Sequence, residues 1–117
     1  MGKFRRIYPK KEKTTPGWGY WGGYGEIEVG ISSSRIEDPE QFQADKLHYH
    51  RKGLIFIVVL EGSGTVEVNG EYIVVKKDEV LRVSPGEKYR HTKVLETPFS
   101  WITFCTSKDP EDKVVVG

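Results

Sequence analysis

The sequence has little of what marks secreted or membrane proteins. Its 117 residues contain one cysteine, Cys105, which cannot form an internal disulfide and fits a reducing compartment. No apolar run approaches the roughly 20 residues that a membrane-spanning helix needs, and the N-terminus has no apolar segment of the kind found in secretory signals. We therefore expect a cytoplasmic protein with no membrane partner.

Thermolabile residues are also scarce, and neither sign of charge is in clear excess. One methionine, one asparagine and two glutamines stand beside 30% charged residues, a composition typical of heat-adapted proteins. The 18 Lys and Arg against 17 Asp and Glu leave a formal net charge of +1, which gives no overall attraction to nucleic acid. A basic run within residues 3–13 is interpreted as a solvated arm or first strand. The expected partners are a small-molecule ligand and a second copy of the chain, in a homodimer.

The chain has room for one domain, built from strands. At 117 residues it can enclose one hydrophobic core and not two. Segments with strand-like alternation follow one another, separated by turn residues, and no long segment has helical periodicity. Strands are predicted at residues 26–31, 47–50, 54–60, 64–68, 71–75, 79–83, 89–95 and 99–106. Many short strands without a long helix predict an all-β sandwich or barrel.

Local signals define the connections between these strands. Asn69-Gly70 predicts a tight hairpin, because both residues tolerate positive φ. Asp38-Pro39 predicts a single helical turn, capped by Asp38. We interpret Gly62-Ser63-Gly64 as a turn between two strands, since no helix follows it as in a phosphate-binding loop. The last apolar residues, Val114-Val115-Val116, are expected to pair with another strand or with a partner subunit.

Residues 17–25 are nearly all glycine and aromatic. The four large rings in this segment can form a stacking platform for a sugar, or they can cover the domain or a dimer interface, which is the interpretation we prefer. They are Trp18, Tyr20, Trp21 and Tyr24. We assign residues 1–25 to an arm that packs on the main domain or on a partner, and residues 26–117 to the main domain.

His48-Tyr49-His50 is the feature that carries chemistry. Residues i and i+2 of a strand point to the same face, so two imidazoles are aimed together at a spacing that one metal ion can bridge. In an arbitrary sequence such a pair is more often two surface histidines. The surrounding residues therefore decide the interpretation.

Those residues resemble the two signatures of the cupin superfamily. The histidine pair is followed by a strand, by Leu60-Glu61-Gly62-Ser63-Gly64 and by a hairpin, as in the first signature. Asp78 at a turn, a strand and Pro85-Gly86 resemble the start of the second. The resemblance covers residues 46 to 105. It implies a single-domain, cupin-type double-stranded β-helix, also called a jelly-roll barrel, that holds a divalent metal ion and a small organic ligand.

Two positions depart from the family pattern. Ile55 occupies the place of the usual metal-binding Glu, and Tyr89 occupies that of the third histidine, with His91 two residues later on the same strand face. The resemblance therefore implies an ion of Fe, Mn, Ni, Co or Zn held by His48, His50 and His91. Whether Tyr89 or His91 fills the third ligand place is left open.

Further residues are expected to bind the ligand. Ile55 would line the barrel and keep the pocket dry, and Tyr89 would add a phenolic oxygen. Arg82 would pair with a carboxylate or phosphate if its strand neighbours pack outward, and otherwise lies on a solvated edge. Trp101 is placed in the pocket with them. Cys105 lies in an apolar strand and is interpreted as packing.

The family and the open metal site imply dioxygenase, isomerase or lyase chemistry on a small organic molecule. No residue is convincing as a general base, because Glu61, Glu67 and Glu96 have turn or surface interpretations, so the catalytic residues are unknown. Two alternatives are a non-catalytic module that binds a sugar or an acid, and a metal-free structural or regulatory cupin whose histidines only pack.

Overall fold

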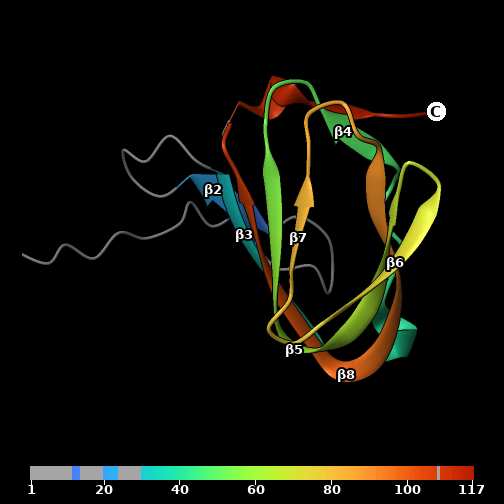
Figure 1. Cartoon of the computed structure of the whole chain (residues 1–117). Coiled ribbons are helices and arrows are strands. Elements are labelled where there is room, and N and C mark those ends of the chain that lie inside the picture. Colours follow the sequence, from blue (N-terminus) through green and yellow to red (C-terminus); the bar gives the residue numbers. More distant parts are fainter. Residues whose placement is uncertain (1–11, 14–19, 24–29, 108) are drawn as a thin grey trace, which may run out of the picture.

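The computed structural model describes residues 12–13, 20–23, 30–107 and 109–117. Strands make up most of these residues, together with two single-turn 3-10 helices (Figure 1). In chain order they are β1 (Glu12–Lys13), β2 (Tyr20–Gly23), β3 (Gly30–Ile36), η1 (Pro39–Gln41), β4 (His48–His50), β5 (Ile55–Val68), β6 (Glu71–Lys76), β7 (Val80–Val83), β8 (Tyr89–Cys105), η2 (Pro110–Asp112) and β9 (Lys113–Val115). Within these ranges, no helix is long and apolar enough to cross a membrane. The predicted all-β class is confirmed.

Two long strands, β5 and β8, form the frame of the barrel. They pair antiparallel from Ile55 opposite Cys105 to Val68 opposite Tyr89, and both bend sharply at the bottom of Figure 1. The first half of β5 pairs with β7, and the matching end of β8 pairs with β3, which continues to β2 and β1. The second half of β5 pairs with β6, and the other end of β8 pairs with β4, which continues to β9. These two walls, joined through the bent pair, make a double-stranded β-helix.

The bend lies at Gly62-Ser63-Gly64, where the sequence predicted a turn between two strands. That prediction was wrong, because β5 continues through all three residues as one strand of 14. A Cβ on Gly62, whose φ is +71°, would lie 2.3 Å from the backbone oxygen of Pro98. A Cβ on Gly64 would lie 2.5 Å from the Phe99 ring. The glycines let β5 pass close against β8 while register shifts curve both strands, and β8 likewise joins two predicted strands into one.

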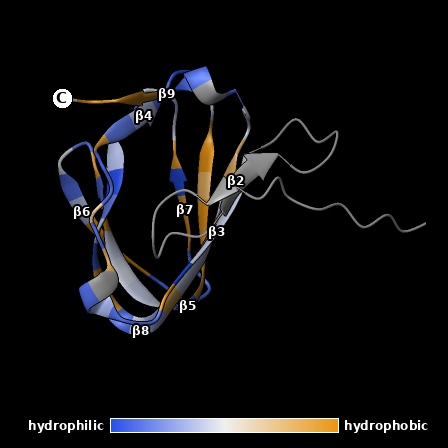
Figure 2. Ribbon diagram, turned by 180° about the vertical axis from the view of Figure 1, so that it is seen from behind, coloured by the Kyte–Doolittle hydropathy of each residue, from blue (hydrophilic) through white to orange (hydrophobic). Residues whose placement is uncertain are grey.

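The core lies between the two walls. Alternate residues of the apolar half of β5, coloured orange in Figure 2, point inward, as strand periodicity requires. On β8, Trp101 is buried and Phe104 is 37% exposed, so this strand is apolar on both faces. The buried apolar residues are Ile36, Ile55, Ile57, Val59, Val66, Val68, Val75, Val83, Tyr89, Val94, Phe99, Trp101 and Cys105.

Three of the predicted connections are confirmed. Asn69 and Gly70 join β5 to β6 with φ values of 48° and 85°. Asp38 caps η1 by accepting a hydrogen bond from the Glu40 N–H at 3.0 Å. Of the two expectations for Val114-Val115-Val116, pairing within the same chain is found, because β9 adds to the outer edge of β4.

The predictions for the N-terminal aromatic segment fall mainly on residues outside the described ranges. Trp18 and Tyr24 are among them, as are residues 26–29 of the predicted strand. Tyr20 and Trp21 lie on β2, for which the backbone alone is described, and β2 pairs with β3 at the edge of one wall. The arm and its role as cover or platform stay predictions.

The bend predicts a large difference between two glycine substitutions. Gly70→Ala meets no atom within 4 Å and should lower the free energy of unfolding by about 1–2 kcal/mol, the cost of positive φ. Gly62→Ala adds a backbone clash and should cost about 2–5 kcal/mol. Urea unfolding of both variants measures the difference. Equal losses would contradict the close approach of β5 and β8.

Candidate metal and ligand site

The strand β4 holds the histidine pair inside the barrel. His48 lies opposite Tyr89 on β8 and opposite Val115 on β9. His48 and His50 are 3% and 6% exposed, whereas Tyr49 between them is half-buried. The alternation of the strand therefore turns both imidazoles to the buried side.

Each imidazole of the pair is held at Nδ1 by an acceptor. His48 Nδ1 lies 2.7 Å from the carbonyl oxygen of Lys46, and His50 Nδ1 lies 3.2 Å from Oδ2 of Asp112. Carbonyl and carboxylate oxygens only accept, so both Nδ1 atoms carry the proton in the neutral rings. The lone pair of each ring is then on Nε2, the atom that a metal ion or a ligand N–H or O–H would meet.

Burial also keeps these rings neutral. It is the main cause that lowers the pKa of both His48 and His50, and the charge of nearby Lys113 acts in the same direction. The acceptors at Lys46 and Asp112 oppose this shift without cancelling it. Neutral imidazoles are the form that binds metal.

His91 lies deeper in the same interior, against aromatic rings. It is 2% exposed and its ring stacks on Trp101 with 4.4 Å between ring centroids, while Phe99 packs on Trp101 at 4.6 Å. Burial, with a smaller contribution from the charge on His48, lowers the pKa of His91 to about 3. His91 is therefore a neutral base within an aromatic cluster.

Tyr89 packs against the histidine pair. Its ring centroid lies 4.3 Å from that of His48 and 6.2 Å from that of His50. Burial raises the pKa of Tyr89, so the phenol keeps its proton. The structure thus brings Tyr89, Trp101 and all three histidines into one buried region, and Ile55, 1% exposed, belongs to the same interior.

Arg82 does not reach this interior. On β7, Val83 is buried and Leu81 packs on the core, so the alternation of the strand turns Arg82 to the outer face, where it is exposed. The sequence placed Arg82 in the pocket only if its neighbours packed outward, and they pack inward. The other expectation, a solvated edge, describes it.

A single ion can be shared only by imidazole rings that lie close together. Each imidazole centroid lies about 3.2 Å from an ion bound at its nitrogen, so two ligating rings have centroids within about 6.4 Å. The His48 and His50 centroids are 5.9 Å apart, which fits. Among the residues that the structure describes, however, the three histidines do not form a group with all ligand atoms within 4.8 Å; His50, Cys105 and Asp112 do.

Asp112 is the residue that the sequence did not point to. It is buried, and its carboxylate accepts hydrogen bonds from the Lys52 N–H at 2.8 Å, the Gly53 N–H at 3.0 Å and His50. Burial opposes ionisation, but these hydrogen bonds outweigh it and lower the pKa of Asp112. Asp112 lies in a polar stretch, 60 residues after Lys52, so the sequence around it gave no local signal that its side chain is buried.

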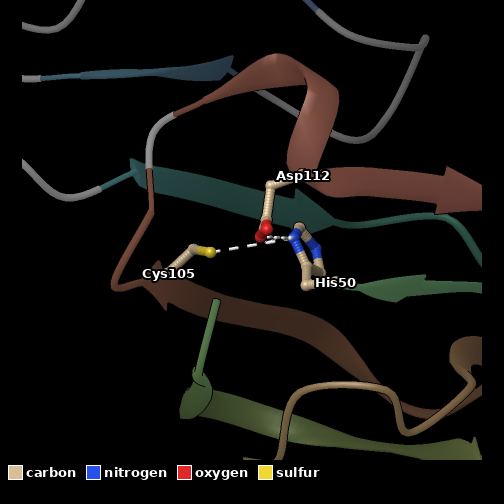
Figure 3. A group of neighbouring side chains, drawn as sticks. All are labelled: His50, Cys105 and Asp112. Atoms are coloured by element: carbon tan, nitrogen blue, oxygen red, sulfur yellow. Dashed lines mark hydrogen bonds and ion pairs between the residues drawn. The ribbon is translucent and has the colours of Figure 1, made fainter. Parts of the chain in front are cut away.

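Figure 3 shows Cys105 and Asp112 pointing toward the same edge of the His50 ring. Cys105 Sγ lies 3.8 Å from His50 Nδ1. The thiol is fully buried, as expected for packing, and burial is the main cause that raises the pKa of Cys105. These side chains come from the ends of β4 and β8 and from η2, and His50 is 55 residues from Cys105 and 62 from Asp112 in the sequence.

Fold and site together define a double-stranded β-helix protein with buried histidines in its barrel. A family model described as Cupin domain matches residues 35–105, and the chain belongs to this family. The matched residues include the three histidines and Cys105 but end before η2, so Asp112 lies outside them. No curated protein matches the chain.

Several solved structures have the same fold. An uncharacterised protein with a double-stranded β-helix domain from Klebsiella pneumoniae is 14% identical, with a TM-score of 0.70 over 94% of this chain and 91% of that one. A protein from Planctomyces limnophilus is 23% identical, with a TM-score of 0.65 over 97% and 96%. Salicylate 1,2-dioxygenase from Pseudoaminobacter salicylatoxidans, solved with gentisate, is 17% identical, with a TM-score of 0.61 over 78% and 25%. At these identities, the likeness shows the fold alone.

The buried neutral histidines predict a loss of stability in mild acid. Between pH 7 and pH 5 the unfolded chain gains a proton at each histidine, whose ordinary pKa is about 6.5, whereas folded His91 stays neutral. The unfolded state binds more protons, so the free energy of unfolding falls, by about 2 kcal/mol for His91 alone. His48 and His50 act in the same direction.

Urea unfolding at pH 7, 6 and 5 measures this loss. The comparison is with His91→Phe, which keeps an aromatic ring against Trp101 but cannot titrate. The variant should lose less stability over this range than the wild-type protein. Parallel curves for the two proteins would contradict the assignment to His91.

Proposed function

We propose that this cupin binds a divalent metal ion and a small organic ligand inside the barrel, with the ion held by Nε2 of His48 and His50 and by His91. One observation carries the proposal: Nδ1 of both paired histidines is engaged by an acceptor, the Lys46 carbonyl or the Asp112 carboxylate. Ligating histidines in metalloproteins almost always donate their other N–H in this way, which fixes the ring and raises its basicity.

The proposed ligand is a small acid with an apolar body. Three neutral imidazoles would leave the ion its full positive charge, which favours an anionic oxygen as a further ligand. Ile55 and Trp101 supply apolar surface, and Tyr89 keeps a phenolic proton that can be donated to the ligand. The similar fold of a dioxygenase solved with gentisate, an aromatic acid, supports this class of ligand.

A bound ion would supply Lewis-acid or oxygen chemistry, as in dioxygenase, isomerase or lyase reactions. The carboxylates considered as general bases are paired elsewhere. Glu67 accepts from Arg90 at 2.9 Å, and Glu96 accepts from the Ser63 hydroxyl at 2.8 Å. The proposal therefore names ion and ligand binding and no catalytic base.

A metal-free barrel that binds the same class of ligand is the second candidate. The stack of His91 on Trp101 favours it, since this contact gives His91 a packing role without an ion.

We further propose that the protein is a cytoplasmic homodimer. Phe104 on β8, 37% exposed on the outer face, is one apolar side chain that a second copy would cover.

Elemental analysis of untagged protein, before and after reconstitution, tests the metal proposal. The wild-type protein should hold about one equivalent of Fe, Mn, Ni, Co or Zn, and His48→Ala/His50→Ala should lose it, since two ligands are removed. Tyr49→Phe, on the opposite strand face, is the matched control and should bind as the wild type does. Less than about a tenth of an equivalent under every condition would reject the metal and leave the metal-free candidate.

A further inference from the structure

A second group of donor atoms lies at the other nitrogen of His50. Its Nδ1, Sγ of Cys105 and a carboxylate oxygen of Asp112 all lie within 4.8 Å of one another, and all three side chains are buried. Figure 3 shows Cys105 and Asp112 pointing to the same edge of the ring. A thiolate, an imidazole and a carboxylate are the three kinds of protein ligand that Zn²⁺ takes.

The distances at His50 Nδ1 are also near those of a coordination polyhedron. In a tetrahedral zinc site, the nitrogen and oxygen ligands are about 3.3 Å apart and the nitrogen and sulfur ligands about 3.5 Å. The corresponding distances here are 3.2 Å and 3.8 Å.

Gly53 leaves space beside these atoms. A Cβ at this position would lie 2.6 Å from Cys105 Sγ, 2.7 Å from Asp112 Oδ2 and 3.5 Å from Cβ of His50. A side chain at this position would therefore displace two of the donors, and glycine lets the backbone pack directly against them.

The geometry points to a zinc-class ion site formed by His50 Nδ1, Cys105 Sγ and Asp112 Oδ2, which we call the clasp because it would tie η2 to the ends of β4 and β8. The charges balance: one thiolate and one carboxylate neutralise the ion. On binding, the thiol of Cys105 releases its proton to solvent and the imidazole proton moves from Nδ1 to Nε2, while Asp112 is already ionised. Three protein donors leave the fourth tetrahedral position to water.

This site shares His50 with the proposed barrel ion but does not rest on it. It uses Nδ1 of His50, whereas the barrel ion would use Nε2, and Asp112 lies outside the residues matched by the family model. An ion on Nδ1 leaves a proton on Nε2, so the two sites exclude one another unless His50 loses both protons. Experiment can therefore distinguish an ion at Nδ1 of His50 from an ion at Nε2.

Titration of the metal-free protein with Co²⁺, a spectroscopic substitute for Zn²⁺, tests the clasp. The wild-type protein should bind about one equivalent with a thiolate-to-cobalt charge-transfer band that Zn²⁺ abolishes by competition. Cys105→Ser should lose the band, and both Cys105→Ser and Asp112→Asn should bind at least about tenfold more weakly. Glu111→Gln, an exposed neighbour of Asp112, is the matched control and should keep the band, as should His48→Ala.

Three results would overturn the clasp. Cobalt binding without the band, unchanged in Cys105→Ser and lost in His48→Ala, places the ion in the barrel and supports the proposed function instead. No cobalt binding rejects both ions. If Cys105→Ser fails to fold, X-ray absorption of the zinc-loaded wild-type protein replaces it: a sulfur neighbour at about 2.3 Å supports the clasp, and nitrogen and oxygen neighbours alone reject it.

Discussion

The antiparallel pairing of β5 with β8 holds the molecule together. Every other strand of the described chain attaches to one of these two, directly or through a neighbour. Because both bend together near Gly62 and Gly64, one pairing contributes to both walls and sets the space between them. The buried rings of Phe99, Trp101 and His91 occupy that space. The register of this pair therefore determines which side chains meet inside the barrel.

The histidine strand depends on a different support. β4 has three residues and pairs with β8 only at His48 opposite Tyr89, so most of its pairing comes from β9. Asp112 then binds the turn after β4 through His50, Lys52 and Gly53, and its carbonyl accepts the Arg51 N–H at 2.9 Å. Hydrogen bonds to a charged group contribute about 1.5–3 kcal/mol each. The C-terminal segment, beyond the family match, thus fixes the position of the candidate ligands.

Burial keeps the histidines in the neutral form that binds an ion, and it also makes their protonation unfavourable. The interior that keeps His48, His50 and His91 neutral, and so able to donate lone pairs, is one in which a protonated imidazole is disfavoured. Each of the paired rings has an acceptor at Nδ1, so neither ring proton is buried without a partner. An ion placed at either nitrogen of His50 would use a ring that the protein already holds in place.

Much of the fold could be read from local pattern. Alternation predicted an all-β chain, Asn69-Gly70 predicted the hairpin, and the i and i+2 spacing of His48 and His50 predicted that both face one side. The resemblance to cupins predicted the barrel and the interior places of Ile55, Tyr89 and His91. These features depend on chain geometry within a few residues, which the sequence states directly.

Other features were decided by closure of the barrel. Periodicity cannot tell whether Gly62-Ser63-Gly64 ends a strand or bends it, because this depends on β8, whose residues opposite Ser63 and Gly64 are Glu96 and Val94. Nor can it tell which face of β7 is inside, and so Arg82 was left open and proved to face outward. The contact of Asp112 with His50 joins segments 62 residues apart in the chain. The sequence by itself determined the strands and the histidine pair; tertiary structure alone decided what surrounds that pair, because long-range contacts form only when the walls close.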